Sequence, residues 1–332
     1  MKKQLAIFFL VLLFAMPIVH AVVPDETFSE VENRPLAARP ELTASSVFSG
    51  RYMDELERYL SDQFPARAQW VGMRANLLHA LGAWEFHDTI VADGVYYQRF
   101  ALAEDTFSFA ERIESVATLM ILPTKAYFWD GAAQTGLPDE RAALGKLPTI
   151  DVVPALSHAT KAYYDSDHHL TSEGAYAVYL AYCEAEGLTP VARYDETTVP
   201  DFHGSLEAQS GLSSDGEEFS YVHFPEGTRV DYDDEGPADG LDLTKLTHRD
   251  KYAVYLSGNH GHLTIHGAGE GTLTVVKDSF ANAILPYLSA HYETIEVYDP
   301  RYMRTKVSLT GDVLVLYNLK NFTEDHALRK FF

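Results

Sequence analysis

Apolar residues recur with helical spacing in the first part of this chain. In "SGRYMDELERYLSDQFPARAQW", the side chains of Tyr52, Leu56 and Tyr59 fall on one side of a helix. Pro65 follows soon after, and proline interrupts a helix because it has no N–H to donate and its ring clashes with the preceding turn. The pattern therefore predicts a helical segment that is broken near Pro65.

Two later segments also have the features of helices. Residues 105–116 are predicted as one helix, and a longer one follows the stretch "YYDSDHHL". Thr171 or Ser172 can cap the start of the longer helix, because a hydroxyl oxygen accepts hydrogen bonds from the N–H groups of the first turn. Gly187, with Pro190 shortly beyond, marks its end.

Short apolar runs alternate with these helical segments. The runs are "VATLMILPTK", "KYAVYLSG", "HLTIHG", "GTLTVVK", "TIEVYDPRY" and "GDVLVLYN". Such a run is typical of a strand whose two faces are both covered, as in a parallel sheet. "DGVYYQRF" differs, because Asp93-Gly94 suits the tight turn of a hairpin. The alternation predicts an α/β fold with a doubly wound, mostly parallel sheet flanked by helices.

Polar residues follow several of the predicted strands. These residues are Lys125, Asp278, Ser279, Arg301 and Asn318. In a doubly wound sheet, ligands bind in the crevice outside the carboxyl ends of the strands. The sequence therefore predicts one polar crevice at this edge of the sheet.

The N-terminus has the three parts of an export signal. "MKK" is basic, "LAIFFLVLLFAMPIV" is apolar, and "VHA" fits a cleavage site after Ala21. The apolar run is shorter than the ~20 residues that a bilayer span requires, which favours a signal peptide, while retention as an uncleaved anchor stays open. We therefore expect an extracytoplasmic protein, either secreted or held at the membrane by this segment.

Composition suggests how the rest of the chain is organised. After a signal peptide at 1–21, we expect an extended, Pro- and Ser-rich arm at 22–50. Residues 51–332 are then expected to form a single α/β domain, since this length suffices for one large core. Residues 212–250 are the most polar part and are expected to be an acidic loop inserted into that domain.

The charge excludes some classes of partner. The formal net charge is −22, and such an acidic surface repels nucleic acid and anionic membranes. Neutral or cationic polymers remain open as partners. Cys183 is the only cysteine, so no disulfide can form within the chain, and we expect it to be a small buried apolar residue.

Ser279 is the candidate nucleophile of the crevice. In "VVKDSFAN" it sits where a buried strand turns into a helix, so its hydroxyl would be exposed at the carboxyl edge of the sheet. Nearby backbone N–H groups would point at the same place and could stabilise an oxyanion. The stretch is not the G-x-S-x-G elbow, and a simple helix cap by Asp278 or Ser279 is the alternative.

The stretch "DSDHH" could supply the base for such a serine. Asp167 and His169 are two residues apart, so in an extended segment their side chains lie on the same side. An aspartate beside a histidine fixes the imidazole tautomer and stabilises the imidazolium. His168 would then point the other way and have a structural role.

Metal binding is the competing interpretation of the acidic and histidine-rich stretches. "DSDHH" has enough oxygen and nitrogen donors, but no recognised ligand spacing accompanies it. The segment Asp231–Asp242 partly resembles a calcium loop, although its last ligand is not the usual glutamate. We predict no metal and no cofactor. Asn259, in "LSGNHG", could reach the crevice as an oxyanion donor or be part of a plain turn.

Several of these blocks together resemble the DHHW family, exported bacterial proteins named for Asp-His-His-Trp. The blocks, in order, are "VENRPLAARPEL", "LSDQFPARAQW", "ILPTKAYFW", "YYDSDHHLTSEGAYAVYLAY", "FHGSLEAQSG", "KYAVYLSGNHGHLTIHG", "VVKDSFANAILPYLSAHYETIEVYDPRY" and "LVLYNLKNF". The resemblance covers nearly the whole chain after the signal segment. Leu170 departs from it, because it stands where the family has tryptophan, and this change could alter the shape of the pocket.

The resemblance implies a fold and a chemistry. The DHHW family is similar to the SGNH-hydrolase-like proteins of alginate O-acetylation, in which an Asp-x-His pair precedes the serine. Asp167, His169 and Ser279 match that order. The implied function is a serine-dependent O-acetyltransferase or acetylesterase with Ser279 as nucleophile, His169 as base and Asp167 orienting it.

The resemblance also suggests binding residues and partners. The backbone N–H of Ser279 or of Phe280, together with Asn282, is a candidate for the oxyanion site beside Asn259. Arg301 and Lys125 are candidates for binding the sugar or the acyl donor. The expected partners are a polysaccharide and an acyl donor, and a membrane-bound protein that hands on the acyl group is a further candidate. The alternative is a non-catalytic protein that binds or assembles glycans on the same scaffold.

Overall fold

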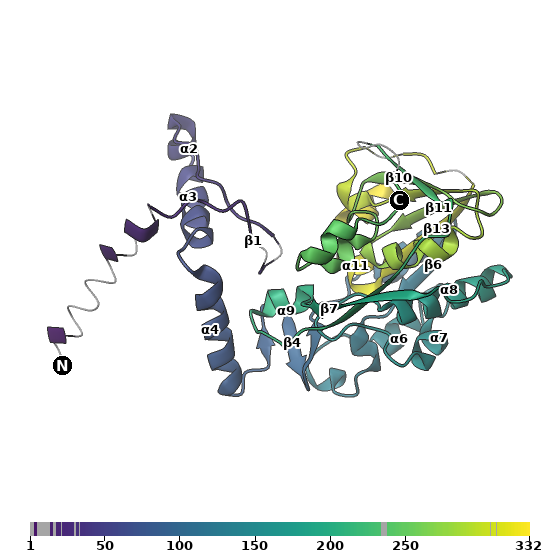
Figure 1. Ribbon diagram of the computed structural model, residues 1–332, viewed down its shortest axis with the longest axis horizontal. Helices are drawn as coiled ribbons and strands as arrows, with labels where there is room; N and C mark the ends of the chain where they lie inside the picture. Colours follow the sequence, from purple (N-terminus) through teal and green to yellow (C-terminus); the bar gives the residue numbers. More distant parts are fainter. Residues whose placement is uncertain are drawn as a thin grey trace. The chain divides into compact units, whose positions relative to one another are not determined.

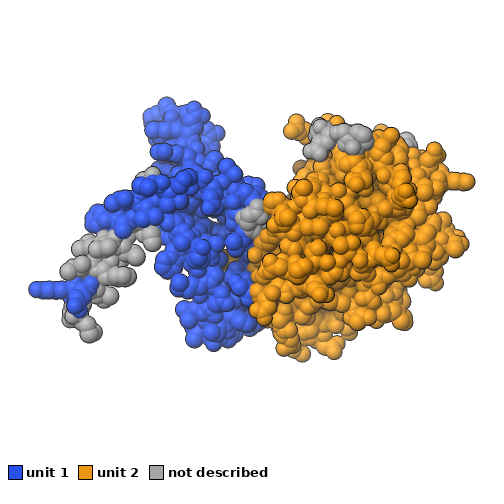
Figure 2. Space-filling view, in the orientation of Figure 1, with its two compact units in different colours: residues 1–86, 208–213 blue, residues 87–207, 214–332 orange. Residues whose placement is uncertain are grey.

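The chain forms two compact units in a computed structural model. The structure describes residues 3–4, 14–15, 18–20, 22–29, 31–32, 34–233, 238–305, 307–309 and 311–332. Contacts group residues 1–86 and 208–213 into unit 1, and residues 87–207 and 214–332 into unit 2 (Figure 2). The predicted domain began at residue 51, whereas these contacts place residues 51–86 with the N-terminal arm.

The predicted signal segment is only partly described. Of residues 1–21, the structure describes 3–4, 14–15 and 18–20. Among all described residues, no helix is both long and apolar enough to cross a membrane. Cleavage and export therefore stay predictions from the sequence.

Unit 1 is mainly helical. Its elements are β1 (Phe28–Ser29), β2 (Arg34–Pro35), α2 (Ala44–Phe48), α3 (Arg51–Asp62), α4 (Arg67–Ala80) and β3 (Glu85–Phe86). Helix α3 ends two residues before Phe64, and α4 starts after Pro65, so the predicted break is confirmed. Arg34 donates two hydrogen bonds to the carboxylate of Asp62, which ties the arm to the end of α3.

Unit 2 is built around a six-stranded sheet (Figure 1). In spatial order its strands are β6 (Thr118–Leu122), β13 (Asp312–Asn318), β11 (Thr272–Lys277), β12 (Thr294–Tyr298), β10 (His262–His266) and β9 (Arg229–Tyr232). The first four strands are parallel, while β10 and β9 pair antiparallel. The predicted fold class, a mostly parallel α/β sheet, is confirmed.

Both faces of the sheet are covered, which explains the uninterrupted apolar runs. Successive side chains of a strand point to opposite faces, and on β11 Val275 belongs to one core cluster while Val276 belongs to the other. The first cluster includes helix α8 (Ser172–Glu186), and the second includes α5 (Thr106–Glu114). Thr171 caps α8 and Gly187 ends it in the left-handed conformation, as predicted.

The remaining elements of unit 2 are short. They are β4 (Thr89–Ala92), β5 (Val95–Gln98), η1 (Lys125–Phe128), η2 (Ala132–Gln134), α6 (Glu140–Leu144), α7 (Val153–His158), β7 (Glu196–Phe202), β8 (Glu217–Val222), η3 (Leu243–Thr247), η4 (Lys251–Val254), η5 (Ser279–Ala283), α10 (Leu285–Leu288), η6 (Pro300–Tyr302), α11 (Leu319–Glu324) and α12 (His326–Phe331). Helix α9 (Ser205–Ser210) spans the boundary between the units. The hairpin predicted at Asp93-Gly94 is confirmed, since both residues have positive φ and β4 pairs with β5.

Two predictions about the acidic half of the chain are wrong. "KYAVYLSG" is not a strand, because Lys251–Val254 forms a 3-10 helix and Leu256 and Ser257 turn the chain with positive φ. The expected loop at 212–250 contains β8 and β9, and β9 joins the main sheet. Only Val230 of β9 is buried, so the strand lacks the hydrophobic pattern by which a strand is recognised in a sequence. Residues 234–237 of the possible calcium loop lie outside the described residues.

Gly174 in α8 offers a test of how tightly this helix fits. A Cβ at Gly174 would lie 2.1 Å from the carbonyl oxygen of Ala162, which is backbone and cannot swing away. We expect Gly174→Ala to lower the free energy of unfolding by about 2 kcal/mol through overpacking. Ala185→Gly, at an exposed position of α8, should cost up to ~1 kcal/mol through helix propensity alone. Urea unfolding of both variants checks this, and a stabilised Gly174→Ala variant would contradict the close contact.

Candidate active site

The stretch "YYDSDHHL" forms a tight loop rather than an extended segment. Tyr163 and Leu170 pair as an antiparallel bridge, and the N–H of Tyr164 donates to the carbonyl of His169 at 3.2 Å. Inside the loop, Asp167 Oδ1 accepts the backbone N–H of His169 at 2.8 Å. An aspartate that accepts an N–H two residues on makes an Asx turn. This turn, not strand geometry, brings the two side chains together.

Asp167 also orients the imidazole of His169. Asp167 Oδ1 lies 2.6 Å from His169 Nδ1, and Oδ2 accepts the N–H of Ser205 at 2.7 Å. Burial alone would raise the pKa of Asp167, but the charges of His168 and His169 and these hydrogen bonds hold it well below its usual range. Asp167 is therefore an ionised carboxylate that makes His169 carry its neutral-form proton on Nδ1 and leaves Nε2 as the acceptor.

Ser279 approaches the other ring nitrogen of His169. Its Oγ lies 2.8 Å from His169 Nε2, although the two residues are 110 apart in the sequence. Ser279 is the first residue of η5 and follows directly on Asp278 after strand β11. Asp278, rather than Ser279, is the cap, since its Oδ1 accepts the N–H of Phe280 at 3.0 Å. The structure thus brings Asp167, His169 and Ser279 into one chain of hydrogen bonds.

Aromatic rings hold the imidazole of His169 in place. Tyr252 stacks on it with ring centroids 3.7 Å apart and planes at 7°. His168 lies on the ring at 3.9 Å, and Phe280 approaches at 5.1 Å. Tyr252 was not predicted as a site residue, because it lies in "KYAVYLSG", which was interpreted as a strand and contains no polar motif. Such contacts restrict the ring rotation that would break its alignment with Ser279.

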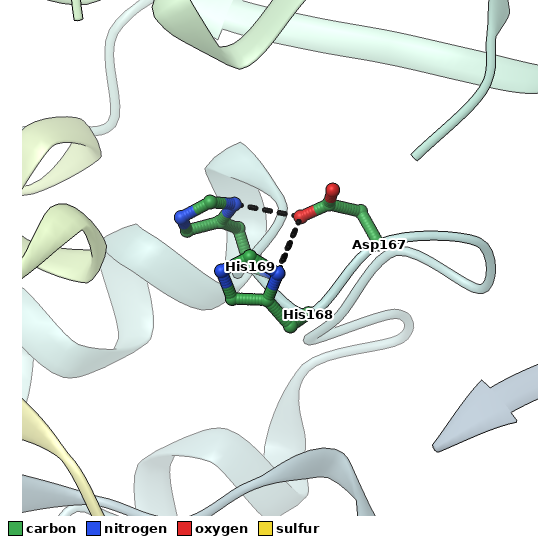
Figure 3. Close-up of side chains that lie close together, drawn as sticks. All are labelled: Asp167, His168 and His169. Carbon is green, nitrogen blue, oxygen red and sulfur yellow. Dashed lines mark hydrogen bonds and ion pairs between the residues drawn. The ribbon is translucent and has the colours of Figure 1, made fainter. Parts of the chain in front are cut away.

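His168 does not turn away from the site, so that prediction is wrong. Figure 3 shows both imidazoles directed at the same oxygen of Asp167. His168 Nδ1 lies 3.7 Å from Asp167 Oδ1 and 2.6 Å from Ser205 Oγ. The prediction assumed alternating side chains, whereas the loop bends. Burial, and then the charge of His169, lowers the pKa of His168 to about 3, so His168 is neutral around pH 7.

The same geometry creates a cluster of three metal-type donors. Ligand atoms of Asp167, His168 and His169 all lie within 4.8 Å of one another. However, His169 already uses both ring nitrogens, with Asp167 and with Ser279, and Asp167 uses both oxygens. A metal ion would have to replace these hydrogen bonds. The arrangement therefore fits the prediction of a metal-free triad better than a metal centre.

The candidate oxyanion donors differ in availability. The N–H of Phe280 is taken by Asp278, so Phe280 does not fit the predicted role. Asn282 does fit, because η5 is a 3-10 helix, and side chains three residues apart in such a helix lie above one another. Ser279 and Asn282 thus share one face of η5. Asn282 remains the side-chain candidate for an oxyanion donor beside Ser279, with one N–H of its NH2 group directed at Asn259.

Lys277 fixes the orientation of the Asn282 amide. Its Nζ donates to Asn282 Oδ1 at 2.8 Å and to Asn259 Oδ1 at 3.1 Å. Because the ammonium takes the oxygen of Asn282, the NH2 group must point elsewhere, and it lies 3.3 Å from Asn259 Oδ1. Asn259 therefore supports Asn282 through its oxygen, which differs from its predicted role as a donor.

Arg301 is paired with a buried carboxylate. Its guanidinium donates to Asp299 at 2.8 Å and 2.6 Å, and Asp299 also lies 3.5 Å from Lys277 Nζ. Burial lowers the pKa of Arg301, but Asp299 outweighs this effect and raises it. If Arg301 binds substrate as predicted, it must do so through guanidinium N–H groups that do not bond Asp299. Its side chain is 27% exposed.

The Lys125 ammonium bonds the protein backbone, so the predicted contact with the sugar or the acyl donor would have to use its aliphatic stem. Its Nζ donates to the carbonyl oxygens of Tyr164, Asp165 and Asp167 at 2.7, 2.7 and 2.8 Å. These acceptors use all three N–H groups of an ammonium. Burial lowers the pKa of Lys125 to about 7, and the Asp167 carboxylate opposes this shift. Lys125 is thus a positioning residue beneath the loop that carries Asp167 and His169.

Leu170, the position where the DHHW family has tryptophan, lies outside the crevice. It is 1% exposed and belongs to the main core cluster, in which Tyr163 and Tyr164 also take part. Its side chain therefore fills the core under α8. Leucine in place of tryptophan therefore affects the packing of the core. The hydrogen bonds among Asp167, His169 and Ser279 form without an indole at this position.

Comparisons with known proteins identify the fold. No protein-family model matches the sequence, and a search of curated proteins finds no match. A DHHW family protein from Eubacterium siraeum is 19% identical, with 73% of this chain and 94% of that chain covered and a TM-score of 0.59. Bacillus cereus PatB1 is 20% identical, with 72% and 98% covered and a TM-score of 0.57.

Two further structures complete the comparison. PatB1 with a sulfonyl adduct is 19% identical, with 72% of this chain and 97% of that chain covered and a TM-score of 0.56. The O-acetyltransferase domain of Pseudomonas putida AlgJ is 12% identical and covers 74% and 95%, but its TM-score of 0.38 is too low to argue from. The structural similarity to a DHHW family protein, predicted from the sequence, is confirmed. At these identities the comparisons establish the fold, and the chemistry has to be argued from the site.

Removing the Lys125 ammonium tests its role under the loop. Lys125→Met would leave three carbonyl groups without their donor, so we expect a loss of about 3 kcal/mol in the free energy of unfolding. Displacement of His169 should also lower the rate of Ser279 labelling by a fluorophosphonate, by at least about tenfold. The control is Lys146→Met, an exposed lysine whose ammonium lies 5.8 Å from the ring centroid of Phe107, and it should matter by under ~1 kcal/mol. Equal free energies of unfolding and equal rates of Ser279 labelling in the two variants would contradict the role of Lys125.

Proposed function

We propose that this protein is a serine-dependent acyl-transfer enzyme, an O-acetyltransferase or acetylesterase that acts on a polysaccharide outside the cytoplasm. One observation carries the proposal. Ser279 Oγ, His169 Nε2, His169 Nδ1 and Asp167 Oδ1 are joined by contacts of 2.8 and 2.6 Å in a buried site. A nucleophile bonded to a base, which is in turn oriented by a carboxylate, is the recurring arrangement for acyl transfer.

The geometry assigns each step to an atom. Ser279 Oγ attacks the acyl carbonyl carbon while His169 Nε2 takes the hydroxyl proton, and Asp167 stabilises the imidazolium. The tetrahedral intermediate collapses, the bond to the donor's leaving oxygen breaks, and Nε2 protonates that oxygen. A sugar hydroxyl or water then attacks the acyl-serine and gives its proton to Nε2. As the bond between the acyl carbon and Ser279 Oγ breaks, Nε2 returns that proton to Oγ. The accepting hydroxyl decides between transferase and esterase.

The proposed substrate and location rest on the sequence. The N-terminal basic and apolar segments favour export, and the net charge of −22 disfavours polymers that carry anionic groups. We infer an acyl donor and a polysaccharide as partners, with a membrane-bound protein as one source of the acyl group. The non-catalytic alternative predicts glycan binding without turnover.

A structural neighbour guides the choice of probe. PatB1 has been solved with a sulfonyl adduct. Sulfonyl and phosphonyl electrophiles attach to activated nucleophiles, so a fluorophosphonate is a suitable reagent for Ser279.

Labelling and turnover test the nucleophile. We expect a fluorophosphonate to modify Ser279, and Ser279→Ala or His169→Ala to lower acetyl-ester turnover by about 10⁴-fold or more. Mass spectrometry locates the adduct, and turnover is followed with and without a chelator, which separates this mechanism from a metal-dependent one. Ser108→Ala, an exposed serine in α5, is the control and should be labelled normally. No adduct on Ser279 together with unchanged turnover in Ser279→Ala would falsify the proposal.

Asn282 can be tested separately from the nucleophile. Asn282→Ala should lower kcat by about 100-fold with little change in KM, because an oxyanion donor acts on the transition state. Asn282→Asp keeps an oxygen for Lys277 but has no NH2 group, so it should lose as much activity as the alanine variant. A largely active Asn282→Asp enzyme would show that Asn282 acts only through its bond to Lys277.

A further inference from the structure

A groove lies beside the loop that carries Asp167 and His169. It has a volume of about 410 Å³ and is open to solvent along one side. Its walls come from three segments of unit 2, namely strand β5, the chain after β6 and the loop itself. The lining residues used below are Tyr97, Lys125, Phe128, Trp129, Asp130 and Asp165.

Aromatic side chains form one wall of the groove and are fixed in place. The rings of Tyr97 and Trp129 stack with centroids 4.3 Å apart and planes at 14°. Gly131 lies against the indole, since a Cβ there would come within 2.5 Å of its ring atoms, so only glycine allows this approach. Phe128 is the most exposed of these rings, at 37%. The wall is therefore a rigid apolar surface that faces solvent.

The free polar groups at the groove are hydrogen-bond acceptors. The Asp130 side chain is fully exposed, and its nearest cation, Arg141, is 3.9 Å away. The Asp165 side chain is 49% exposed and uses one oxygen for Lys161. The one ammonium that lines the groove, that of Lys125, donates to three backbone carbonyls. The groove therefore suits a ligand that donates hydrogen bonds and carries no negative charge.

The groove shares a loop with the proposed catalytic site, because Asp165 lines the groove. Asp165 precedes Asp167 by two residues, and Lys125 Nζ bonds the carbonyl oxygens of both. A chain that occupied the groove would therefore contact the loop that presents His169 to Ser279.

We propose that this groove binds the pyranose rings of an uncharged polysaccharide, as a subsite for the acyl acceptor. The C–H faces of such rings would pack on Phe128 and Trp129, and their hydroxyls would donate to Asp130 and Asp165. The role as an acceptor subsite rests on the proposed function, whereas binding itself does not. Uronate polymers are excluded by the two carboxylates.

The test measures binding without turnover. Full-length protein carrying Ser279→Ala is run by affinity gel electrophoresis in soluble glucan, mannan, xylan and N-acetylated glycol chitin, and in alginate, polygalacturonate and chitosan. At least one uncharged polymer should retard it. Adding Phe128→Ala should weaken that retardation about tenfold, and adding Asp130→Asn about threefold. Tyr302→Ala removes a ring that is 55% exposed and lies outside the groove, so it should change nothing.

Several outcomes would overturn the proposal. They are retardation by no uncharged polymer, retardation only by chitosan or by the uronates, and equal retardation of the parent, Phe128→Ala and Asp130→Asn proteins. Because Asp130 is fully exposed, its variant remains informative if Phe128→Ala fails to fold. A failure of the proposed function would give a different result. Ser279 would not react with the fluorophosphonate, while polymer binding would still be weakened by the Phe128 and Asp130 substitutions.

Discussion

The carboxylate of Asp167 is the group on which the candidate site depends. Its two oxygens accept the backbone N–H groups of His169 and Ser205 as well as the imidazole Nδ1 of His169. The first contact bends the loop, the second fixes the loop to the neighbouring chain, and the third turns the imidazole towards Ser279. A buried carboxylate without such donors would cost several kcal/mol or take up a proton. The conformation of the loop and the tautomer of the base therefore form together.

Ser279, the proposed nucleophile, is likewise positioned by a buried aspartate that accepts backbone N–H groups. Asp278 is fully buried, and it accepts the N–H of Phe280 through Oδ1 and the N–H of Asn318 through Oδ2. One oxygen thus starts η5 and the other fastens it to the end of β13, so the hydroxyl of Ser279 is held at the carboxyl edge of the sheet. Two aspartates that bind backbone N–H groups therefore position His169 and Ser279. Such fixed placement is what acyl transfer requires, because an error of 1 Å can cost about 100-fold in rate.

The sequence predicts the regular part of this architecture well. Strand β11 was recognisable because a run such as Val275-Val276 has both faces covered, and Ser279 was placed at an edge that parallel topology defines. The loop that carries Asp167 and His169 was harder to predict. Its shape depends on contacts with Ser205 and Lys125, which are distant in the sequence, and on the Asp167 side chain, which accepts backbone N–H groups. Periodicity describes regular elements only. For this reason the pair of Asp167 and His169 was found, while the orientation of His168 was missed.

Charge burial explains why the residues around the site are polar rather than apolar. Asp167, Asp278 and Asp299 are each at most 3% exposed, and buried cations lie near them. Lys277 bonds Asn282 and lies 3.5 Å from Asp299, so its charge offsets a carboxylate and orients an amide at once. Replacing both members of such a buried ion pair with apolar residues would often leave stability unchanged or raise it, whereas removing one member alone is destabilising. Their value lies in fixed dipoles, which act strongly in a site that excludes water and need no reorganisation as charge develops on the substrate. Under the proposed function, the buried lysines and aspartates would serve a developing oxyanion more than the stability of the sheet.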